Sequence, residues 1–151
     1  MVIEIVAVGW DDPRGEALRA AQRVELAIRY ETPDSEPGPP PGAHDIALFL
    51  VAMDAGTAIG CGGLRPIDDS RGEVKRMYVV PERRGSGVSA AILRALEAAA
   101  RDRGWTRLLL ETGDRQPDAI RFYEREGYER IPNFGHYVGS DISLCYAKPL
   151  T

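Results

Sequence analysis

Two arginines and two glycines stand together in the segment VVPERRGSGVSAAILRALE, residues 79–97, where a strand pattern gives way to a helical one. The first amides of a helix lack partners within it, and the aligned peptide dipoles leave partial positive charge at that end. Gly85 and Gly87 allow a tight turn and a close approach of a ligand, and Arg83 and Arg84 add charge. The segment therefore predicts a diphosphate site. The alternative is a tight turn with solvated arginines, because a short glycine motif is weak evidence alone.

Two other phosphate-binding loops fit the segment poorly. A Walker loop requires lysine followed by serine or threonine after its last glycine, and Val88 and Ser89 stand there instead. A dinucleotide fingerprint follows an N-terminal strand and has an acidic residue about 20 positions later. Here the glycines come after several predicted strands, and Glu111 is the best match for the acidic residue. The first loop is excluded and the second is disfavoured.

The same residues resemble the GNAT superfamily of N-acetyltransferases. The family signature is arginine or glutamine, two residues, glycine, one residue, then glycine or alanine. It falls on Arg84, Gly87 and Ser89, with serine as a departure in the last place. Downstream, QPDAIRFYEREGY is similar to the next family helix, with Gln116 where asparagine is usual and Tyr123 where tyrosine is usual. The resemblance covers about residues 45–150.

The resemblance implies acetyl-coenzyme A (acetyl-CoA) as the ligand, with no metal. Its pyrophosphate is expected on the amides of Arg84, Gly85, Ser86, Gly87, Val88 and Ser89. Its pantetheine arm is expected along Met77, Tyr78 and Val79, inserted like an added strand between two parallel strands that splay apart. The Gln116 amide is expected to reach this arm.

Adjacent Lys75 and Arg76 interrupt the alternation of polar and apolar residues in the core strand. A β-bulge explains the interruption by giving one strand an extra residue, and an exposed edge with two solvated charges explains it equally well. A bulge would free a backbone amide near Met77 or Tyr78. Such an amide is a natural donor to the oxygen that becomes negative during acetyl transfer.

Acetyl transfer to an amine also needs a base for the amine and an acid for the departing thiolate. A phenol titrates at about pH 10 and a thiol at about 8.5, so a tyrosine keeps its proton at neutral pH yet can lend it to sulfur. By resemblance to the family's acid, Tyr123 is the expected donor, although it could instead be core beside Phe122. Glu73 begins the core strand, where some family members place a glutamate, and it is the expected base. The fallback bases are Glu111, Asp141 and His136.

The two cysteines favour direct transfer over an acetyl-enzyme. Cys61 and Cys145 have no neighbouring histidine in sequence and lie in apolar strands, where a buried thiol is generally inert. With two histidines far apart, they also form no zinc spacing.

The elements that must position these residues follow from apolar periodicity and turn residues. Strands are expected at residues 2–8, 44–54, 56–64, 72–80, 106–112 and 142–150, and helices from Asp12–Pro13, Val88 and Pro117. The apolar positions of the first helix are Ala17, Ala21, Val24 and Ile28. Residues 31–43, with five prolines, are expected to form a surface loop rather than a mobile flap.

The order of these elements predicts an α/β fold in the α+β sense. Strands pair locally first, and then strand, helix, strand and helix alternate, which predicts a mixed sheet with helices on its faces. The resemblance implies a GNAT-like, mostly antiparallel sheet of six to seven strands with a central splay, flanked by about four helices.

Length and composition limit the functions further. A chain of 151 residues predicts one domain, residues 1–151. Its net charge of −4 lacks the general attraction that nucleic acid binders use. No apolar run reaches the roughly 20 residues of a membrane span, and the N-terminus has no basic leader, so a cytoplasmic protein is expected.

Two functions of different classes remain open. The first is an N-acetyltransferase acting on a primary amine of a small molecule or peptide, and the second is a non-catalytic acetyl-CoA-binding sensor or interaction module. The amine is expected against the first helix, residues 31–43 and the segment NFGHYVGSD, whose acidic side chains either attract a cation or solvate a loop. The resemblance is also compatible with a homodimer formed through the last strand.

Overall fold

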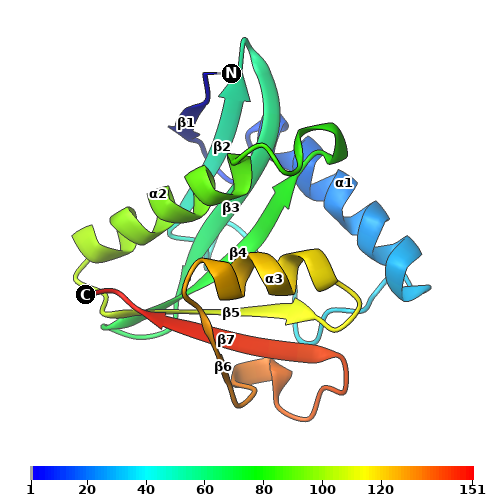
Figure 1. The fold of residues 1–151 in the computed structure, drawn as a ribbon, viewed down its shortest axis with the longest axis vertical. Helices are drawn as coiled ribbons and strands as arrows, with labels where there is room; N and C mark the ends of the chain where they lie inside the picture. The colour runs from blue at the N-terminus through cyan, green and yellow to red at the C-terminus, as the bar shows by residue number, and fades with distance from the viewer. Residues whose placement is uncertain (1) are drawn as a thin grey trace.

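The centre of the fold is a seven-stranded sheet in the order β1-β2-β3-β4-β5-β7-β6 (Figure 1). The computed structural model describes residues 2–151. The strands are β1 (Glu4–Ala7), β2 (Leu48–Asp54), β3 (Thr57–Pro66), β4 (Arg71–Val79), β5 (Arg107–Gly113), β6 (Glu129–Ile131) and β7 (Ser143–Pro149). Only β4 and β5 pair in parallel, so the expected mixed, mostly antiparallel sheet is confirmed. The short edge strand β6 was not predicted.

Three α-helices flank this sheet, where about four were expected. They are α1 (Pro13–Tyr30), α2 (Val88–Asp102) and α3 (Pro117–Arg125). There are also two 3-10 turns in the described residues, η1 (Pro81–Arg83) between β4 and α2 and η2 (Gly135–Tyr137) between β6 and β7. Asp12 caps α1 by accepting from the Arg14 amide, as its position before Pro13 suggested. The part described contains no helix between α1 and β2, because five prolines there remove backbone donors and clash with a helical path.

Apolar residues on both faces of the sheet form two core clusters. One face packs against α2 and α3 through residues such as Leu64, Ile92 and Leu108, all fully buried. The other face carries Phe49 and Val51 of β2, which pack with residues of α1. Successive strand side chains point to opposite faces, so both clusters draw on the same strands.

The sheet opens between β4 and β5, as Figure 1 shows by the divergence of the two arrows. Their parallel pairing is confined to Arg71–Glu73 opposite Arg107–Leu109. Beyond Glu73 the two strands part, while β5 stays paired with β7 as far as Gly113. The expected central splay is therefore present, and the β4 backbone after Glu73 has no strand partner on its β5 side.

A β-bulge lies at the start of this free edge. Cys61 of β3 pairs with Tyr78 and Gly63 pairs with Lys75, so β4 carries one extra residue between the two pairs. Arg76 takes a positive φ of 57°, in the left-handed region that accommodates such an insertion. Of the two explanations for adjacent Lys75 and Arg76, the bulge is correct.

The orientation of α1 differs from the prediction. Its stripe of Ala17, Ala21, Val24 and Ile28 faces solvent, with Val24 and Ile28 61% and 75% exposed. The helix instead turns Arg19 inward, where the guanidinium stacks 3.6 Å from the Trp10 ring centroid and donates to the Trp10 carbonyl. The cation–π contact and the hydrogen bond offset part of the cost of burying this charge. No helix in residues 2–151 is long and apolar enough to cross a membrane.

Candidate functional site

The glycine segment forms an open cradle at the start of α2. Gly85 and Gly87 take positive φ values of 79° and 90°, and a Cβ at either position would meet no atom within 4 Å. The first hydrogen bond of the helix runs from the Ala91 amide to the Gly87 carbonyl. The amides of Val88 and Ser89 therefore have no acceptor within the helix, and the empty space before them suits an anion.

The two arginines before the cradle are already paired. Arg84 donates from Nη1 and Nη2 to both carboxylate oxygens of Glu25 on α1, at 2.8 and 3.0 Å, and from Nε to the Val79 carbonyl. Arg83 forms an ion pair of 2.6 Å with Asp54. Most of the attraction for an anion must then come from backbone amides, rather than from free guanidinium groups as the sequence suggested.

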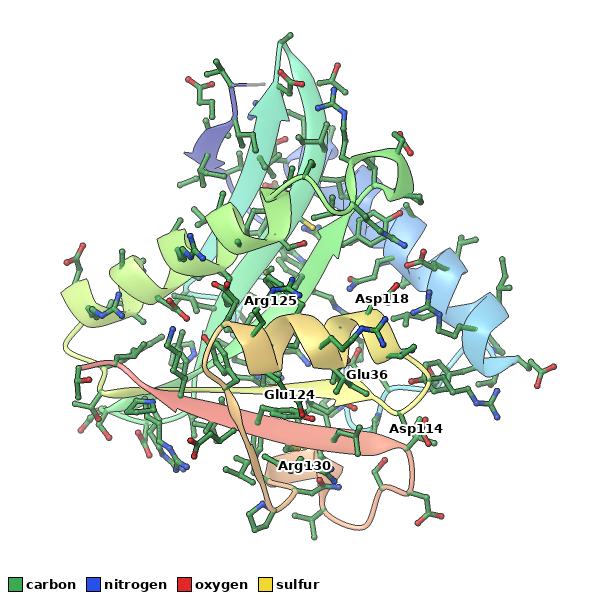
Figure 2. The ribbon with its side chains drawn as sticks, viewed as in Figure 1. Glu36, Asp114, Asp118, Glu124, Arg125 and Arg130 are labelled. Atoms are coloured by element: carbon green, nitrogen blue, oxygen red, sulfur yellow. The ribbon has the colours of Figure 1, made fainter. Side chains whose placement is uncertain are left out.

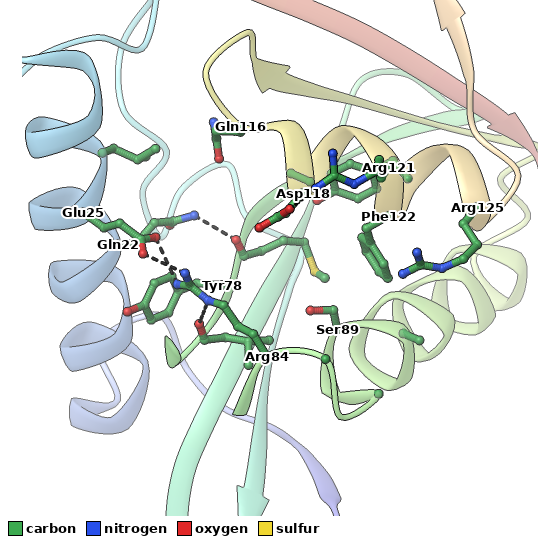
Figure 3. A pocket seen from close by; sticks show the side chains of 18 of the residues that line it. Gln22, Glu25, Tyr78, Arg84, Ser89, Gln116, Asp118, Arg121, Phe122 and Arg125 are labelled. Atoms are coloured by element: carbon green, nitrogen blue, oxygen red, sulfur yellow. Dashed lines mark hydrogen bonds and ion pairs between the residues drawn. The ribbon is translucent and has the colours of Figure 1, made fainter. Parts of the chain in front are cut away.

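The cradle opens into a large cavity of about 600 Å³, called the main cleft here (Figure 3). It lies across the splay between α1 and α3. Its lining includes the predicted residues Met77, Tyr78, Val79, Arg84, Gly85, Gly87, Ser89, Gln116 and Tyr123. The structure thus brings together residues from β4, the cradle and α3 that are up to 46 positions apart in sequence, from Met77 to Tyr123.

Sequence reasoning missed the residues that α1 contributes to the main cleft and, apart from Tyr123, those that α3 contributes. From α1 these are Gln22, Glu25, Leu26 and Arg29, and from α3 they include Asp118, Arg121, Phe122 and Arg125. Figure 2 shows Asp118 and Arg125 on α3, and Figure 3 shows Gln22 and Glu25 across the cleft from them. The α1 set recurs at three- and four-residue steps, so it forms one helical face. The sequence carries this spacing, but the apolar stripe on a different side of the helix gives the stronger signal for a buried face.

Backbone groups of β4 face the main cleft in alternation. The Val80 amide donates to the Ile59 carbonyl of β3, so Tyr78, two residues earlier, also directs its peptide groups toward β3. Met77 and Val79 direct theirs into the splay. Their carbonyls accept from Gln22 Nε2 at 2.9 Å and from Arg84 Nε at 2.9 Å.

A second cleft of about 100 Å³ adjoins the main cleft and is lined by residues of α1, β4, β5 and α3. The two share six lining residues, namely Gln22, Leu26, Met77, Gln116, Ala119 and Tyr123. The second cleft adds charged residues, among them Glu36, Glu73, Lys75, Arg76 and Glu111. A ligand in the main cleft can therefore meet a polar ligand in the second cleft beside Tyr123.

Glu73, the expected base, lines the second cleft, and its side chain is buried. It is 1% exposed, and it accepts from Arg65 Nη2 at 2.7 Å and from Tyr137 Oη at 2.6 Å. These bonds occupy Oε1 and Oε2, and Lys75 Nζ lies 3.7 Å from Oε2. A carboxylate held in this way has a fixed orientation, and both of its oxygens already accept hydrogen bonds.

Glu36 ties residues 31–43 to the bulge. Its carboxylate pairs with Lys75 Nζ at 2.6 Å and with Arg76 Nη1 at 2.8 Å. Burial alone would raise the pKa of Glu36, but the charges of Lys75 and Arg76 outweigh it and lower that pKa. Glu36 is thus a structural partner of β4, and its charge is not free to attract a cationic ligand.

Tyr123 lines both clefts, and Glu111 lines the second cleft with it. Burial, followed by the nearby charge of Glu111, raises the pKa of Tyr123, so the phenol keeps its proton. Burial also raises the pKa of Glu111, although the Ser143 hydroxyl donates to it at 2.7 Å. A phenol that stays protonated can donate a proton, and a nearby carboxylate with a raised pKa can accept one. The pair therefore suits general acid–base catalysis.

The remaining sequence candidates lie elsewhere. His136 and Asp141 are exposed and line neither cleft. Cys61 is fully buried and burial raises the pKa of its thiol to about 12, so this thiol stays protonated. Cys145 is also buried, and its pKa is raised by the same cause. Neither thiol is disposed to act as a nucleophile.

Comparison with known proteins places this architecture among acetyltransferases. Residues 16–128 match the model of the acetyltransferase (GNAT) family. An IAA acetyltransferase of Azospirillum brasilense is 41% identical over 103 residues, which are 68% of this chain and 67% of that protein. A crystal structure from Klebsiella pneumoniae, described as an acyl-CoA N-acyltransferase, has a TM-score of 0.82 with 34% identity over 99% of both chains. An N-acetyltransferase of Thermoplasma acidophilum, solved with coenzyme A, has the same fold at 20% identity, with a TM-score of 0.73 over 99% of both chains.

The pairing of Arg84 with Glu25 predicts that Glu25→Gln strengthens anion binding at the cradle. Without the Glu25 carboxylate, the charge of the Arg84 guanidinium beside the main cleft is no longer neutralised by that partner. Inorganic diphosphate should therefore bind about 2- to 5-fold more tightly at low salt. Titration calorimetry measures the dissociation constant. Glu16→Gln, which removes the same charge from an exposed position in the first turn of α1, should leave it unchanged. Unchanged or weaker binding by the Glu25 variant would contradict this account.

Proposed function

The chain belongs to the acetyltransferase (GNAT) family, and from that premise we propose that acetyl-CoA occupies the main cleft while the acceptor amine enters the second cleft. The protein is an acetyl-CoA-dependent N-acetyltransferase. When bound, acetyl-CoA supplies the acetyl group as an activated thioester. The observation that carries the assignment of the clefts is that Tyr123 lines both of them, and that the main cleft also includes the glycine cradle.

The cradle fits the pyrophosphate of acetyl-CoA. Gly85 and Gly87 leave open the space that a side chain would fill, and both use backbone conformations that other residues rarely adopt. The residues proposed to hold the pyrophosphate through their amides are Arg84, Gly85, Ser86, Gly87, Val88 and Ser89. Serine at position 89 keeps the backbone accessible because its side chain is small.

The pantetheine arm is proposed to lie along β4, in the splay. Met77 and Val79 direct their peptide groups toward it, so an extended arm can pair with the strand as an added strand would. Tyr78 contributes through its side chain, since its own peptide groups face β3. Gln116, the residue before α3, is proposed to contact the arm, and its position in the lining of both clefts supports this proposal.

Two groups are proposed to act on the reacting thioester. The Met77 amide, which the bulge and the end of strand pairing leave facing the splay, donates to the acetyl oxygen as negative charge develops there. Tyr123 donates its phenolic proton to the departing sulfur, because burial keeps that proton in place at neutral pH. Both thiols of the chain are buried, which supports direct attack by the amine without an acetyl-enzyme.

Two carboxylates of the second cleft are candidates for the base that takes the proton of the amine. Glu73 remains the proposal from the sequence, but its oxygens already accept from Arg65 and Tyr137. Glu111 is the alternative that the contacts favour, because it faces Tyr123 and burial makes it more basic. In this second arrangement Glu73 orients Arg65 and Tyr137 around the cleft.

The acceptor is proposed to be a primary amine of a small molecule or peptide. Relatives act as acetyltransferases, so a non-catalytic acetyl-CoA sensor is not favoured. Action in the cytoplasm, without nucleic acid or membrane partners, is likewise a proposal. So is a homodimer, although β6 covers residues 145–147 on the outer edge of β7 and so restricts pairing through that strand.

The function is tested by release of coenzyme A from acetyl-CoA with ethanolamine, putrescine, lysine or a short peptide as acceptor. Tyr123→Phe should retain coenzyme A binding yet lower kcat by about 100-fold or more, because only the acid is removed. Tyr128→Phe changes a neighbouring buried tyrosine that donates to Glu97, and it should affect stability rather than rate. An unchanged rate in Tyr123→Phe would remove this residue from the acid role.

Gly87→Val should abolish coenzyme A binding while the domain stays folded. The branched side chain enters the open cradle and strains a residue whose φ is 90°. We expect calorimetry to give a dissociation constant for coenzyme A that is at least about 100-fold higher. Gly56→Val imposes the same kind of strain at φ 83° in the β2–β3 turn, also in open space, and should bind normally. Equal loss in both variants would indicate a general effect of strain.

The two candidate bases are separated by pH profiles of kcat/KM. If Glu111 is the base, wild-type activity rises with pH through its raised pKa, because the carboxylate must be ionised to accept a proton. Glu111→Gln should then remove this rise and lower kcat/KM about 100-fold or more. Glu73→Gln should keep the rise but unfold at lower urea, since Arg65 loses a buried charged partner. The reverse pattern would assign the base to Glu73.

A further inference from the structure

The side-chain amide of Gln22 has a fixed orientation. Its Nε2 donates to the Met77 carbonyl at 2.9 Å (Figure 3). A carbonyl oxygen only accepts, so a rotated amide would oppose two oxygens and lose this bond. The contact therefore determines which end of the Gln22 amide faces β4, and the other end can only accept a hydrogen bond.

That other end, Oε1, is buried without a partner. Within the described residues it is one of two buried side-chain polar atoms that have no hydrogen bond, and the second is Arg19 Nη1, which belongs to no cleft. Leaving a buried acceptor unpaired costs free energy, so such atoms are few in folded proteins and call for an explanation. A donor supplied by a ligand would satisfy Oε1.

The location of Gln22 indicates which ligand. It lines both clefts and contacts Met77, the residue whose carbonyl faces the splay. A ligand extended along β4 and an amine arriving from the second cleft both pass this position. Both carry N–H groups, in the pantetheine amides and in the attacking amine respectively.

We infer that Gln22 is a substrate-binding residue whose Oε1 accepts an N–H from the bound substrates, either a pantetheine amide or the acceptor amine. The inference rests on the proposed use of the two clefts. It gives α1 a direct part in binding, because the helix anchors on β4 through one end of this side chain and offers the other end to the ligand. It also explains why α1 turns a polar face toward the sheet.

Two substitutions separate the acceptor from the anchor. Gln22→Met keeps an unbranched side chain of similar length but removes both hydrogen-bonding ends. Gln22→Glu cannot donate to the Met77 carbonyl, yet it keeps an acceptor. Arg23→Met is the matched control, since Arg23 is exposed at the next position of the same helix. Calorimetry with coenzyme A gives the dissociation constant, and turnover of the best amine of the panel gives its KM.

We expect Gln22→Met to weaken the binding of one of the two substrates by about 3- to 10-fold. Gln22→Glu should bind that substrate with an affinity closer to that of the wild type. A weaker dissociation constant for coenzyme A assigns the donor to pantetheine, and a higher KM for the amine alone assigns it to the acceptor. Changes below about twofold in both, or equal losses in both Gln22 variants, would overturn it. Failure of the wild-type protein to bind coenzyme A would instead remove the proposed function, and this inference with it.

Discussion

The end of strand pairing between β4 and β5 is the constraint on which the site depends. Pairing stops at Glu73 and Leu109, and the bulge at Arg76 turns the next residues of β4 along an edge without a strand partner. On this edge the Met77 and Val79 carbonyls accept from Gln22 and Arg84, and the Met77 amide is the group proposed to donate to a ligand. The main cleft and the second cleft meet at this opening, and Tyr123 lines both of them.

An opened sheet needs support across the gap, and α1 supplies it. Near its C-terminal end, the Tyr30 hydroxyl accepts from the Arg115 amide in the β5–α3 connection, and Arg115 donates to the Arg29 carbonyl. Earlier in the helix, Gln22 and Glu25 bind β4 and Arg84. Both arms of the splay are thus held by one helix. This role explains a polar inner face on α1, since backbone groups and a guanidinium are what it contacts.

Charges around the second cleft form a connected network. Each member of the network binds the next, in the order Arg65, Glu73, Tyr137, Lys75 and Glu36. These bonds fix β3, β4, η2 and residues 31–43 together. Glu111 differs because its hydrogen bond comes from the neutral Ser143 hydroxyl. Burial raises the pKa of Glu111, and the charge of Lys75 opposes this change without outweighing it. The division of roles among these carboxylates follows from which of them have cationic partners.

The sequence alone determined what depends on neighbours along the chain. Gly85 and Gly87 before an apolar helical pattern predicted the cradle, and Pro13, Val88 and Pro117 marked three helix starts, because turns, caps and periodicity are local properties. Tertiary structure decided the rest: the pairing of Arg84 with Glu25, the burial of Glu73, and the solvent-facing stripe of Val24 and Ile28. Each of these depends on which distant side chain arrives as a partner. Residue spacing along the chain does not specify these contacts, because they form only when distant elements pack together in the folded protein.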